Sequence, residues 1–295
     1  MEATPKRQLR FAFITPCVGE AFFGPVKRGM SDAAAALGVD CTFGGTEEVD
    51  LPLQAEMVRQ AVADGYDGIA LSVIHPTAFN AVIREALERG IPVIAFNVAA
   101  GHPASGCLSA VCQDLHEAGK ALGRHAAPAI AEKARVLMTV HSEGISALED
   151  RLRGAQEILA GKGVRWQIVT TGMDPPRAAE VVTKALVADP QIHAILCSGQ
   201  ADTEGAGLAV ERGFPGQGYY VAGFDLSPEI LRLIKAGGIA FTMDQQPYAQ
   251  GFYPVVQLAL YCRYGLRPAD MDAGAAIIAR DNVDSALRLS VAGYR

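Results

Sequence analysis

The chain alternates short apolar runs with longer stretches whose apolar residues recur with the period of a helix. The runs at 9–15 (LRFAFIT), 68–74 (GIALSVI) and 92–97 (PVIAFN) are typical of strands that are covered on both faces. Helical stretches at 24–37 and 77–89 lie between them, and each is followed by a glycine, the residue favoured just past a helix end. This part of the chain therefore predicts βαβ units with parallel strands and helices on both faces of a sheet.

The same alternation restarts after a strand-like run at 107–112 (CLSAVC). Residues 67–97 hold a strand, a loop and a helix before ALERGIPVIAFN, and residues 192–225 repeat that order before AVERGFPGQGYYVAGFD. The remaining pattern predicts strands at 39–43, 134–140, 164–170, 194–199 and 219–225 and helices at 52–64, 114–131, 148–160, 177–188, 203–212 and 248–264. A chain of 295 residues, 50% of them hydrophobic, also suits two lobes.

Two of these strands carry a polar residue to the point where the strand leaves the core. PVIAFN ends in Asn97, and the apolar run YYVAGF is followed by Asp225. Ligands of open parallel sheets bind outside the carboxyl ends of the strands. Asn97 and Asp225 are therefore expected beside a polar ligand, one in each lobe.

The sequence lacks the signatures of nucleic-acid-binding proteins, of several classes of enzyme and of zinc proteins. The net charge is −6 and no basic cluster stands out, which argues against nucleic acid as a partner. No glycine-rich nucleotide loop, nucleophile elbow or zinc-type spacing of Cys and His occurs. His141, Ser142 and Glu143 have acid–base side chains but no accompanying nucleophile motif, so a surface loop is the preferred interpretation. We expect no catalytic residue, no metal and no cofactor.

Three further stretches suit the recognition of hydroxyl groups, but each also has an interpretation that involves no ligand. Phe22 and Phe23 follow the first strand, where one ring packs under the next helix or both stack on the apolar face of a sugar. Arg151 lies near the start of a helix that follows a strand. Its forked guanidinium either binds two ligand oxygens or forms an ion pair with an acidic side chain on the solvated face of the helix. Gln245 and its neighbour Gln246 end a short strand, as loop residues or as hydroxyl ligands.

Cysteine usage and the first residues leave two questions open. The six cysteines are scattered, and in a single strand the odd spacing of Cys107 and Cys112 points them to opposite faces, so whether they form a disulfide stays open. No apolar run is long enough to span a bilayer. The start MEATPKRQLR lacks the apolar region of a secretory signal, which leaves a cytoplasmic protein or one whose signal was removed.

Taken together, these features resemble the type I periplasmic binding proteins, in the ribose- and galactose-binding branch that includes the ligand domain of the LacI/GalR repressors. The resemblance extends from about Leu9 to Ala279 and rests on EAFFGPVKRGMSDAAAALG, ALERGIPVIAFN, VAGFD and TMDQQPYAQG, in that order. It implies two Rossmann-like α/β lobes with parallel sheets, joined by a three-strand hinge and closing around one solute. The implied lobes are 1–112 plus 246–272 and 113–245 plus 273–295, with the ligand cleft between them.

The resemblance also implies where the ligand is held. The aromatic clamp falls on Phe22 and Phe23, with Glu20 where ribose binders have asparagine, and the hydroxyl-binding arginine falls on Arg151. The GFD aspartate matches Asp225, and the hinge-side glutamine matches Gln245. The implied ligand-binding residues are Glu20, Phe22, Phe23, Asn97, Arg151, Met173, Gln200, Asp202, Asp225 and Gln245.

Some of these positions depart from the family pattern. Asn97 and Val98 stand where sugar binders have an Asp-Arg pair, so both charges are missing, and Met173 replaces an aromatic ring. Gly199 stands where the family has asparagine, so Gln200 or Asp202 is expected to take over its role. These departures argue against D-ribose as the ligand but leave the class of protein unchanged.

The resemblance implies a solute-binding protein of an ABC importer that binds a small sugar, polyol or sugar derivative and performs no covalent chemistry. Glu20 and Asp225 together suit an ammonium group, so an amino sugar stays open. The implied partners are the importer's membrane subunits, the protein is expected to be a monomer, and the location is the periplasm after removal of a signal peptide.

Three alternatives differ in class. A repressor of this family carries a helix-turn-helix of roughly 50–60 residues before the first strand, and only eight residues precede Leu9 here. A sensor that serves a chemoreceptor or a histidine kinase would keep the same site and change only the partner. An α/β enzyme would have to turn over its bound sugar.

Overall fold

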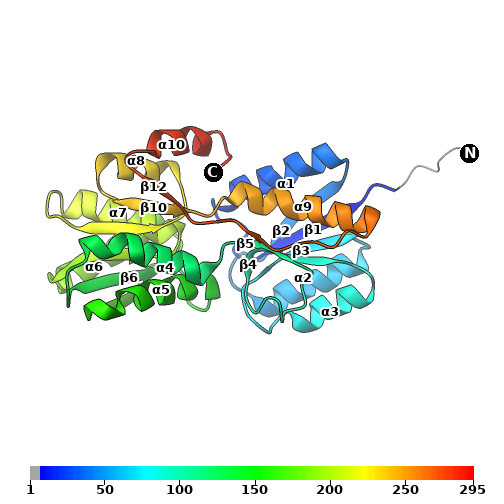
Figure 1. Ribbon diagram of the computed structural model, residues 1–295, viewed down its shortest axis with the longest axis horizontal. Helices are drawn as coiled ribbons and strands as arrows, with labels where there is room; N and C mark the ends of the chain where they lie inside the picture. The colour runs from blue at the N-terminus through cyan, green and yellow to red at the C-terminus, as the bar shows by residue number, and fades with distance from the viewer. Residues whose placement is uncertain (1–6) are drawn as a thin grey trace, which may run out of the picture. The chain divides into compact units, whose positions relative to one another are not determined.

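The protein folds into two compact units (Figure 1). The computed structural model describes residues 7–295, apart from the side chain of Ser146. The first unit holds the chain up to Cys112 together with Gln246–Ala273, and the second holds Gln113–Gln245 together with Gly274–Arg295. The chain therefore passes between the units three times. The sequence places the third passage one residue earlier, and residues 1–6 of its first lobe lie outside the described part.

The first unit is built on a six-stranded sheet in which all neighbouring strands run parallel. In spatial order its strands are β11 (Met271–Asp272), β5 (Ala110–Cys112), β4 (Val93–Ala99), β3 (Gly68–Val73), β1 (Arg10–Thr15) and β2 (Asp40–Gly45). All six residues of β3 are buried because the strand lies in the middle of the sheet with helices on both faces. Its run GIALSV is apolar for this reason.

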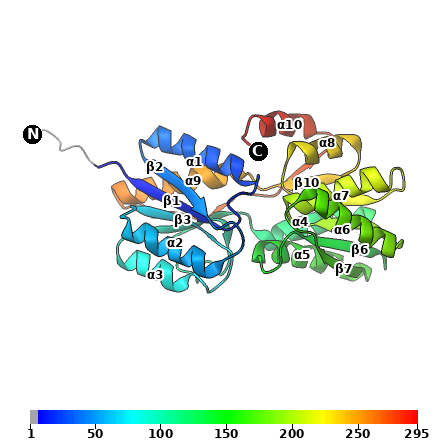
Figure 2. The same cartoon turned by 180° about the vertical axis from the view of Figure 1, so that it is seen from behind.

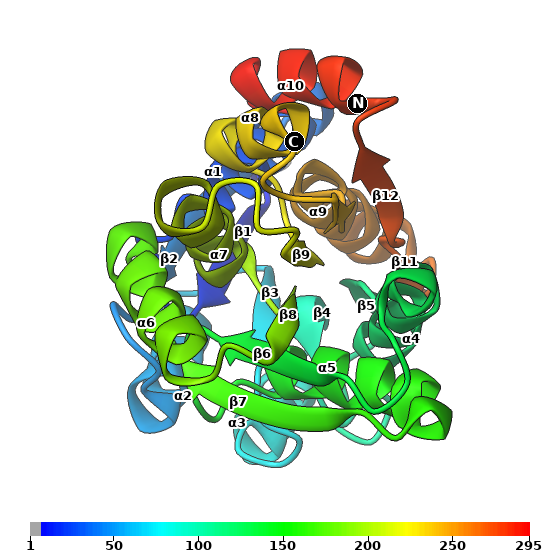
Figure 3. The same cartoon turned by 90° about the vertical axis from the view of Figure 1, so that its left-hand side faces the viewer.

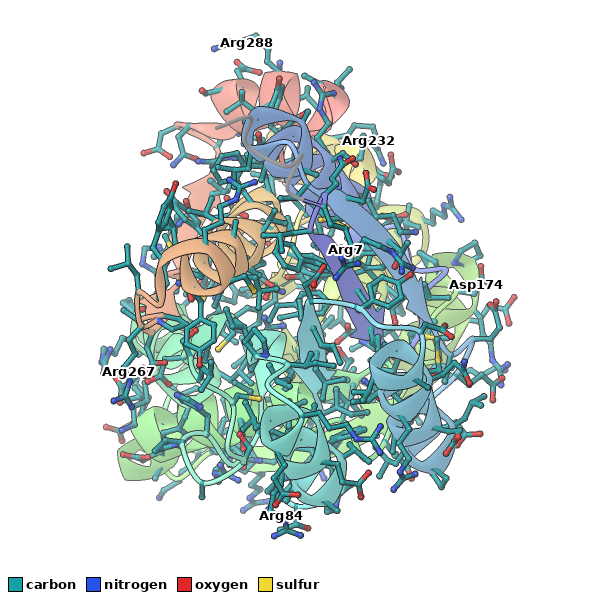
Figure 4. The ribbon with its side chains drawn as sticks, turned by 90° about the vertical axis from the view of Figure 1, so that its right-hand side faces the viewer. Arg7, Arg84, Asp174, Arg232, Arg267 and Arg288 are labelled. Carbon is teal, nitrogen blue, oxygen red and sulfur yellow. The ribbon has the colours of Figure 1, made fainter. Side chains whose placement is uncertain are left out.

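Helices cover both faces of this sheet. They are α1 (Phe23–Leu37), α2 (Leu51–Ala63), α3 (Asn80–Glu88) and α9 (Pro247–Tyr264). Figures 1 and 2 show α1 and α9 on one face and α2 and α3 on the other. Two glycines allow α1 and α9 to touch: a Cβ on Gly29 would lie 2.1 Å from the carbonyl oxygen of Tyr248, and one on Gly251 would lie 1.9 Å from that of Val26. On α3, Arg84 is exposed and projects away from the sheet (Figure 4).

The second unit repeats this architecture with one antiparallel strand. Its spatial order is β12 (Ala276–Ala279), β10 (Phe241–Asp244), β9 (Tyr220–Phe224), β8 (Ile192–Cys197), β6 (Arg135–Val140) and β7 (Arg165–Thr170). β12 runs antiparallel to β10, and the other neighbouring pairs are parallel. β9 holds the third place in this sheet, as β4 does in the first. The two strands are therefore equivalent in place. The predicted strand 92–97 is too short, because β4 continues to Ala99 and Asn97 lies inside it, whereas Asp225 directly follows β9.

The helices of the second unit also divide between the two faces of its sheet. They are α4 (Leu115–Ala126), α5 (Ser146–Leu159), α6 (Pro175–Ala188), α7 (Gln200–Gly213), α8 (Pro228–Ala236) and α10 (Val283–Val291). In Figure 3, α6, α7 and α8 lie on one side of the sheet and α4 and α5 on the other. Glycines bring α4 against α5, because a Cβ on Gly119 would lie 2.1 Å from the carbonyl oxygen of Arg151. This packing fixes the helix that carries Arg151.

The predicted fold class, two Rossmann-like α/β lobes with parallel sheets, is confirmed. The predicted strand 107–112 is too long: β5 begins at Ala110, and Cys107 lies in the preceding loop. Cys107 and Cys112 are not joined by a disulfide in the structure, which answers the question that the sequence left open. The predicted helix 114–131 is also too long, since α4 ends at Ala126 and a 3₁₀ turn with a proline follows.

Over residues 7–295, none of the helices combines the length and the apolar character that crossing a bilayer requires.

Candidate ligand-binding site

Asp225 directly follows β9 and ends its apolar run. The side chain is only 6% exposed, and the backbone has φ +71°, a left-handed conformation that Asp and Asn adopt more readily than most residues. Nε2 of Gln245 donates to its Oδ1, and the backbone N–H of Gln200 at the start of α7 donates to the same carboxylate. Burial raises the pKa of Asp225, while Arg151 and the hydrogen bonds oppose that rise. The carboxylate is therefore held in one orientation at the carboxyl edge of the sheet.

Arg151 reaches the same carboxylate from α5. Its Nη1 lies 3.8 Å from Oδ2 of Asp225, and its guanidinium lies over the ring of Phe224, 4.2 Å from the centroid. Nη1 donates to the carbonyl oxygen of Ser198 (2.8 Å), and Nε and Nη2 both donate to Oε1 of Gln113 (3.1 and 2.9 Å). The residue is only 2% exposed, and burial lowers its pKa while two nearby carboxylates oppose that change. Such a buried cation is tolerated because it is both paired and hydrogen-bonded.

Asp202 and Gln200 lie in the first turn of α7, where their contacts are structural. Oδ2 of Asp202 accepts hydrogen bonds from Thr139 Oγ1 (2.6 Å) and the Ser198 N–H (2.8 Å), and Oδ1 accepts one from the Gly199 N–H (2.9 Å). Burial raises the pKa of Asp202 to about 7. Nε2 of Gln200 donates to the carbonyl oxygen of Leu226. These contacts explain both residues without a ligand, and their binding role stays a prediction.

His141 is the residue that sequence reasoning missed. The surface-loop interpretation is correct for the exposed Glu143 but wrong for His141, which is buried directly after β6. A Cβ on Gly199 would lie 2.8 Å from Cδ2 of His141, so the imidazole fills the space that a side chain at 199 would need. Burial, with Arg151 nearby, lowers the pKa of His141 to about 4 and keeps the ring neutral at pH 7. The sequence feature that could have identified His141 is its position directly after a strand, which it shares with Asp225.

Asn97 occupies in the first unit the place that Asp225 has in the second. The register between β3 and β4 shifts around it, and its backbone also has a left-handed φ of +64°. Its Oδ1 accepts a hydrogen bond from Ser72 Oγ (3.2 Å), and its Nδ2 donates to Oε1 of Gln250 (3.4 Å). The next residue, Val98, is buried in the core. The Asn97 side chain is therefore hydrogen-bonded to uncharged partners.

Phe22 and Phe23 are both packed in the hydrophobic core. They are 7% and 4% exposed and meet edge to face, with ring centroids 5.2 Å apart. Phe23 also contacts Phe43 (5.6 Å), and both rings belong to the cluster that includes Val26 of α1. The packing alternative thus describes both rings. Glu20 is half-buried just before them, and the aromatic clamp stays a prediction.

Met173 lies apart from these residues, in the loop between β7 and α6, and is 39% exposed. Its proposed role as a replacement for an aromatic wall stays a prediction. The structure brings together the predicted residues Arg151, Asp225 and Gln245 in the second unit, with Gln113 as a partner that the sequence did not single out. Gln113 gave no signal because it follows a strand-like run as an ordinary polar residue.

No group of three His, Cys, Asp or Glu side chains in the described part of the chain is arranged to hold a metal ion.

Comparisons with known proteins agree with this architecture. A family model of the periplasmic binding protein domain matches residues 11–265. The xylose/arabinose-binding protein XylF of Sulfolobus acidocaldarius is 27% identical over 95% of this chain and 73% of its own length. The ABC transporter periplasmic-binding protein YphF of Escherichia coli is 28% identical over 73% of this chain and 68% of its own length. A carbohydrate transporter structure from Acidothermus cellulolyticus, in complex with myo-inositol, has a TM-score of 0.86 at 27% identity and covers 98% of this chain and 100% of its own.

Proposed function

The chain belongs to the periplasmic binding protein family, and on that premise we propose that it binds a small, uncharged sugar or polyol reversibly and delivers it to an ABC importer. In this proposal the ligand is held by strand-end residues, with Asp225 as the main hydrogen-bond acceptor. The protein performs no covalent chemistry on the ligand and acts as a monomer in the periplasm. The printed names of the relatives, which include sugar-binding, periplasmic and ABC transporter proteins, support this assignment.

The observation that carries the proposal is the fixed carboxylate of Asp225. It lies at the carboxyl edge of a parallel sheet, where ligands of such sheets bind. Gln245 and Arg151 hold it in place, so a ligand hydroxyl meets an acceptor that is already oriented. Preorganised polar groups of this kind orient small ligands at little entropic cost.

The charge around Asp225 favours an uncharged ligand over an amino sugar. The carboxylate already faces the guanidinium of Arg151, which lies 3.8 Å away. A ligand ammonium at the same carboxylate would meet this cation and be repelled by it. A hydroxyl group donates a hydrogen bond without that repulsion.

Isothermal titration calorimetry tests the proposal with D-xylose, L-arabinose, myo-inositol and D-glucosamine. We expect one of the three uncharged compounds to bind. Replacement of Asp225 by Ala should then weaken binding roughly 10- to 100-fold, since a hydrogen bond to a charged group contributes about 1.5–3 kcal/mol. Arg84→Ala, on the exposed surface of α3, is the matched control and should bind as the wild type does. Absence of binding to all four compounds would overturn the proposal, and preferential binding of D-glucosamine would restore the amino-sugar alternative.

A further inference from the structure

The three passages between the units are Cys112–Gln113, Gln245–Gln246 and Ala273–Gly274. Gln113, Gln245 and Gly274 are the residues of the second unit that adjoin them. Gln113 and Gln245 are both buried, although each lies where the chain leaves its unit. Buried amides of this kind are normally hydrogen-bonded, and each donates to a group of the second unit: Gln113 to Gly274 and Gln245 to Asp225.

The first and third passages are joined through Gln113. Its Nε2 donates to the carbonyl oxygen of Gly274 at 2.7 Å. Its Oε1 accepts two hydrogen bonds from Arg151, at 3.1 and 2.9 Å. A single amide thus connects two passages and links both to one guanidinium.

The second passage reaches the same guanidinium by another route. Nε2 of Gln245 donates to Oδ1 of Asp225, and Oδ2 of Asp225 lies 3.8 Å from Nη1 of Arg151. Residues that adjoin all three passages are therefore within two side-chain contacts of Arg151. The planar fork of arginine suits this position, because it donates in several fixed directions at once.

We propose that Arg151 is a positioning residue that ties the three passages together and passes the occupancy of Asp225 on to them. The second half of this statement rests on the proposed function, in which a ligand hydroxyl donates to Asp225. Such a hydroxyl shares the carboxylate with Arg151 and weakens their pairing. The guanidinium is then held more strongly by its hydrogen bonds to Gln113. Gln113 passes this change on to Gly274, to which it is also hydrogen-bonded.

The backbone at two of the passages is sensitive to such a restraint. Gly274 and Gln246 have φ values of +81° and +51°, in the left-handed region. On the side of the first unit, Nε2 of Gln246 donates to the carbonyl oxygen of Ala273 at 2.7 Å, so the second and third passages are joined there as well. A residue other than glycine in this conformation persists only where its surroundings hold it.

Hydrogen–deuterium exchange on the ligand-free protein tests the network without any assumption about the ligand. Gln113→Leu removes the contacts to both Gly274 and Arg151. We expect exchange to become about five- to tenfold faster in peptides that cover 273–275 and also in those that cover 245–247, which Gln113 reaches only through Arg151 and Asp225. Faster exchange at 273–275 alone would overturn this relay, the path from Gln113 through Arg151 and Asp225 to Gln245, because it would show that Gln113 affects only its direct contact Gly274.

Two conservative variants keep the test decisive if Gln113→Leu does not fold. Gln113→Glu keeps the acceptor for Arg151 but loses the donor to Gly274, so it should speed exchange at 273–275 more strongly than at 245–247. Arg151→Lys keeps the charge but loses the fork, so it should speed exchange at both. The matched control is Gln257→Leu on α9, whose amide donates to the carbonyl oxygen of Ala269 and accepts from Ser109, both in the first unit. Equal effects of Gln257→Leu and Gln113→Leu at 245–247 would also overturn the relay.

The ligand-dependent half is tested by repeating the exchange measurement with the compound that binds in calorimetry. We expect its saturation to slow exchange at 273–275 in the wild type, and this slowing to disappear in Gln113→Leu when the ligand concentration is raised until the variant is saturated as well. Slowing that persists in Gln113→Leu would contradict the transmission. If no compound binds, the proposed function fails. The measurements on the ligand-free protein still decide whether Arg151 ties the three passages together.

Discussion

Asn97 lies near the end of β4 and Asp225 directly follows the equivalent strand β9, and the backbones of both residues adopt a left-handed conformation, yet their surroundings differ in charge. Asn97 bonds to Ser72 and Gln250, which are both uncharged. Asp225 is buried beside Arg151 and bonds to Gln245. The two units thus share a left-handed polar residue at matching places of their sheets, while the side chains that bond to it differ.

The difference in charge is accompanied by shifted pKa values of the buried groups near Asp225. Near Asp225, burial shifts the pKa of Arg151 and His141 downward and that of Asp202 upward. Asn97 is itself uncharged and bonds to the uncharged side chains of Ser72 and Gln250. A charged strand end needs a second layer of residues to support it, and Gln113 and Arg151 supply that layer in the second unit.

Removal of the cation should have the largest effect and break the comparison most clearly. Arg151→Leu leaves the carboxylate of Asp225 buried without its counter-charge. Loss of one partner from a buried ion pair costs about 3–5 kcal/mol, so the free energy of unfolding should fall by about that much. Urea denaturation followed by circular dichroism measures it, with unfolding of the two units resolved where their transitions separate.

Arg153→Leu is the matched control for this prediction. Arg153 lies on the same helix, but its side chain is exposed and pairs with Asp150 at the surface. Exposed pairs contribute little to stability, so this variant should unfold almost as the wild type does. Similar losses for both variants would mean that Arg151 acts through helix packing rather than through charge.

The sequence could predict most of the architecture and part of this difference. The apolar runs and glycine stops located the strands and helices, because buried parallel strands and helix ends have strong local signals. Asn97 and Asp225 were found because a polar residue at the end of an apolar run is conspicuous. The extent of the run at 107–112 was wrong, since strand pairing at its start depends on distant neighbours rather than on its own residues.

The support around the site could not be predicted from the sequence. Gln113 follows β5, His141 follows β6 and Arg151 lies on α5, and nothing local shows that they meet. The burial of His141 depends on Gly199, which lies 58 positions later in the sequence. Such contacts follow from the packing of α5, α7 and the sheet, which composition and periodicity do not encode.

The pH dependence of stability should sharpen the comparison, because it originates in the charged strand end. Burial raises the pKa of Asp202 from 3.8 to about 7, so the folded protein binds the extra proton between these values and this group favours folding as the pH falls. The pKa of His141 is lowered from 6.5 to about 4, so the unfolded chain binds the extra proton and this group disfavours folding as the pH falls. The two contributions oppose each other between about pH 4 and 6.5.

His141→Asn should therefore become more stable relative to the wild type as the pH falls from 6.5 towards 4.5, by at most about 1.4 kcal/mol per pH unit. Urea midpoints at pH 7, 6, 5 and 4.5 measure this trend. His193→Asn is the control, since His193 is exposed on β8 and its replacement should give curves parallel to those of the wild type. A constant difference between His141→Asn and the wild type at all four pH values would show that His141 is not held neutral by its surroundings.

The smallest effect tests what the two strand ends share. Ala and Gly both remove the side chain at Asn97 or Asp225, but only Gly adopts a left-handed backbone without steric cost. Gly should therefore be more stable than Ala at each position, by about 1 kcal/mol. Ser72 lies within β3, and glycine inside a strand costs about 0.5–1 kcal/mol relative to alanine, so the order should reverse there. If Ala and Gly are equal at both strand ends while Ser72 behaves as expected, the left-handed turn contributes no strain, and the equivalence of Asn97 and Asp225 is limited to their place in the sheet.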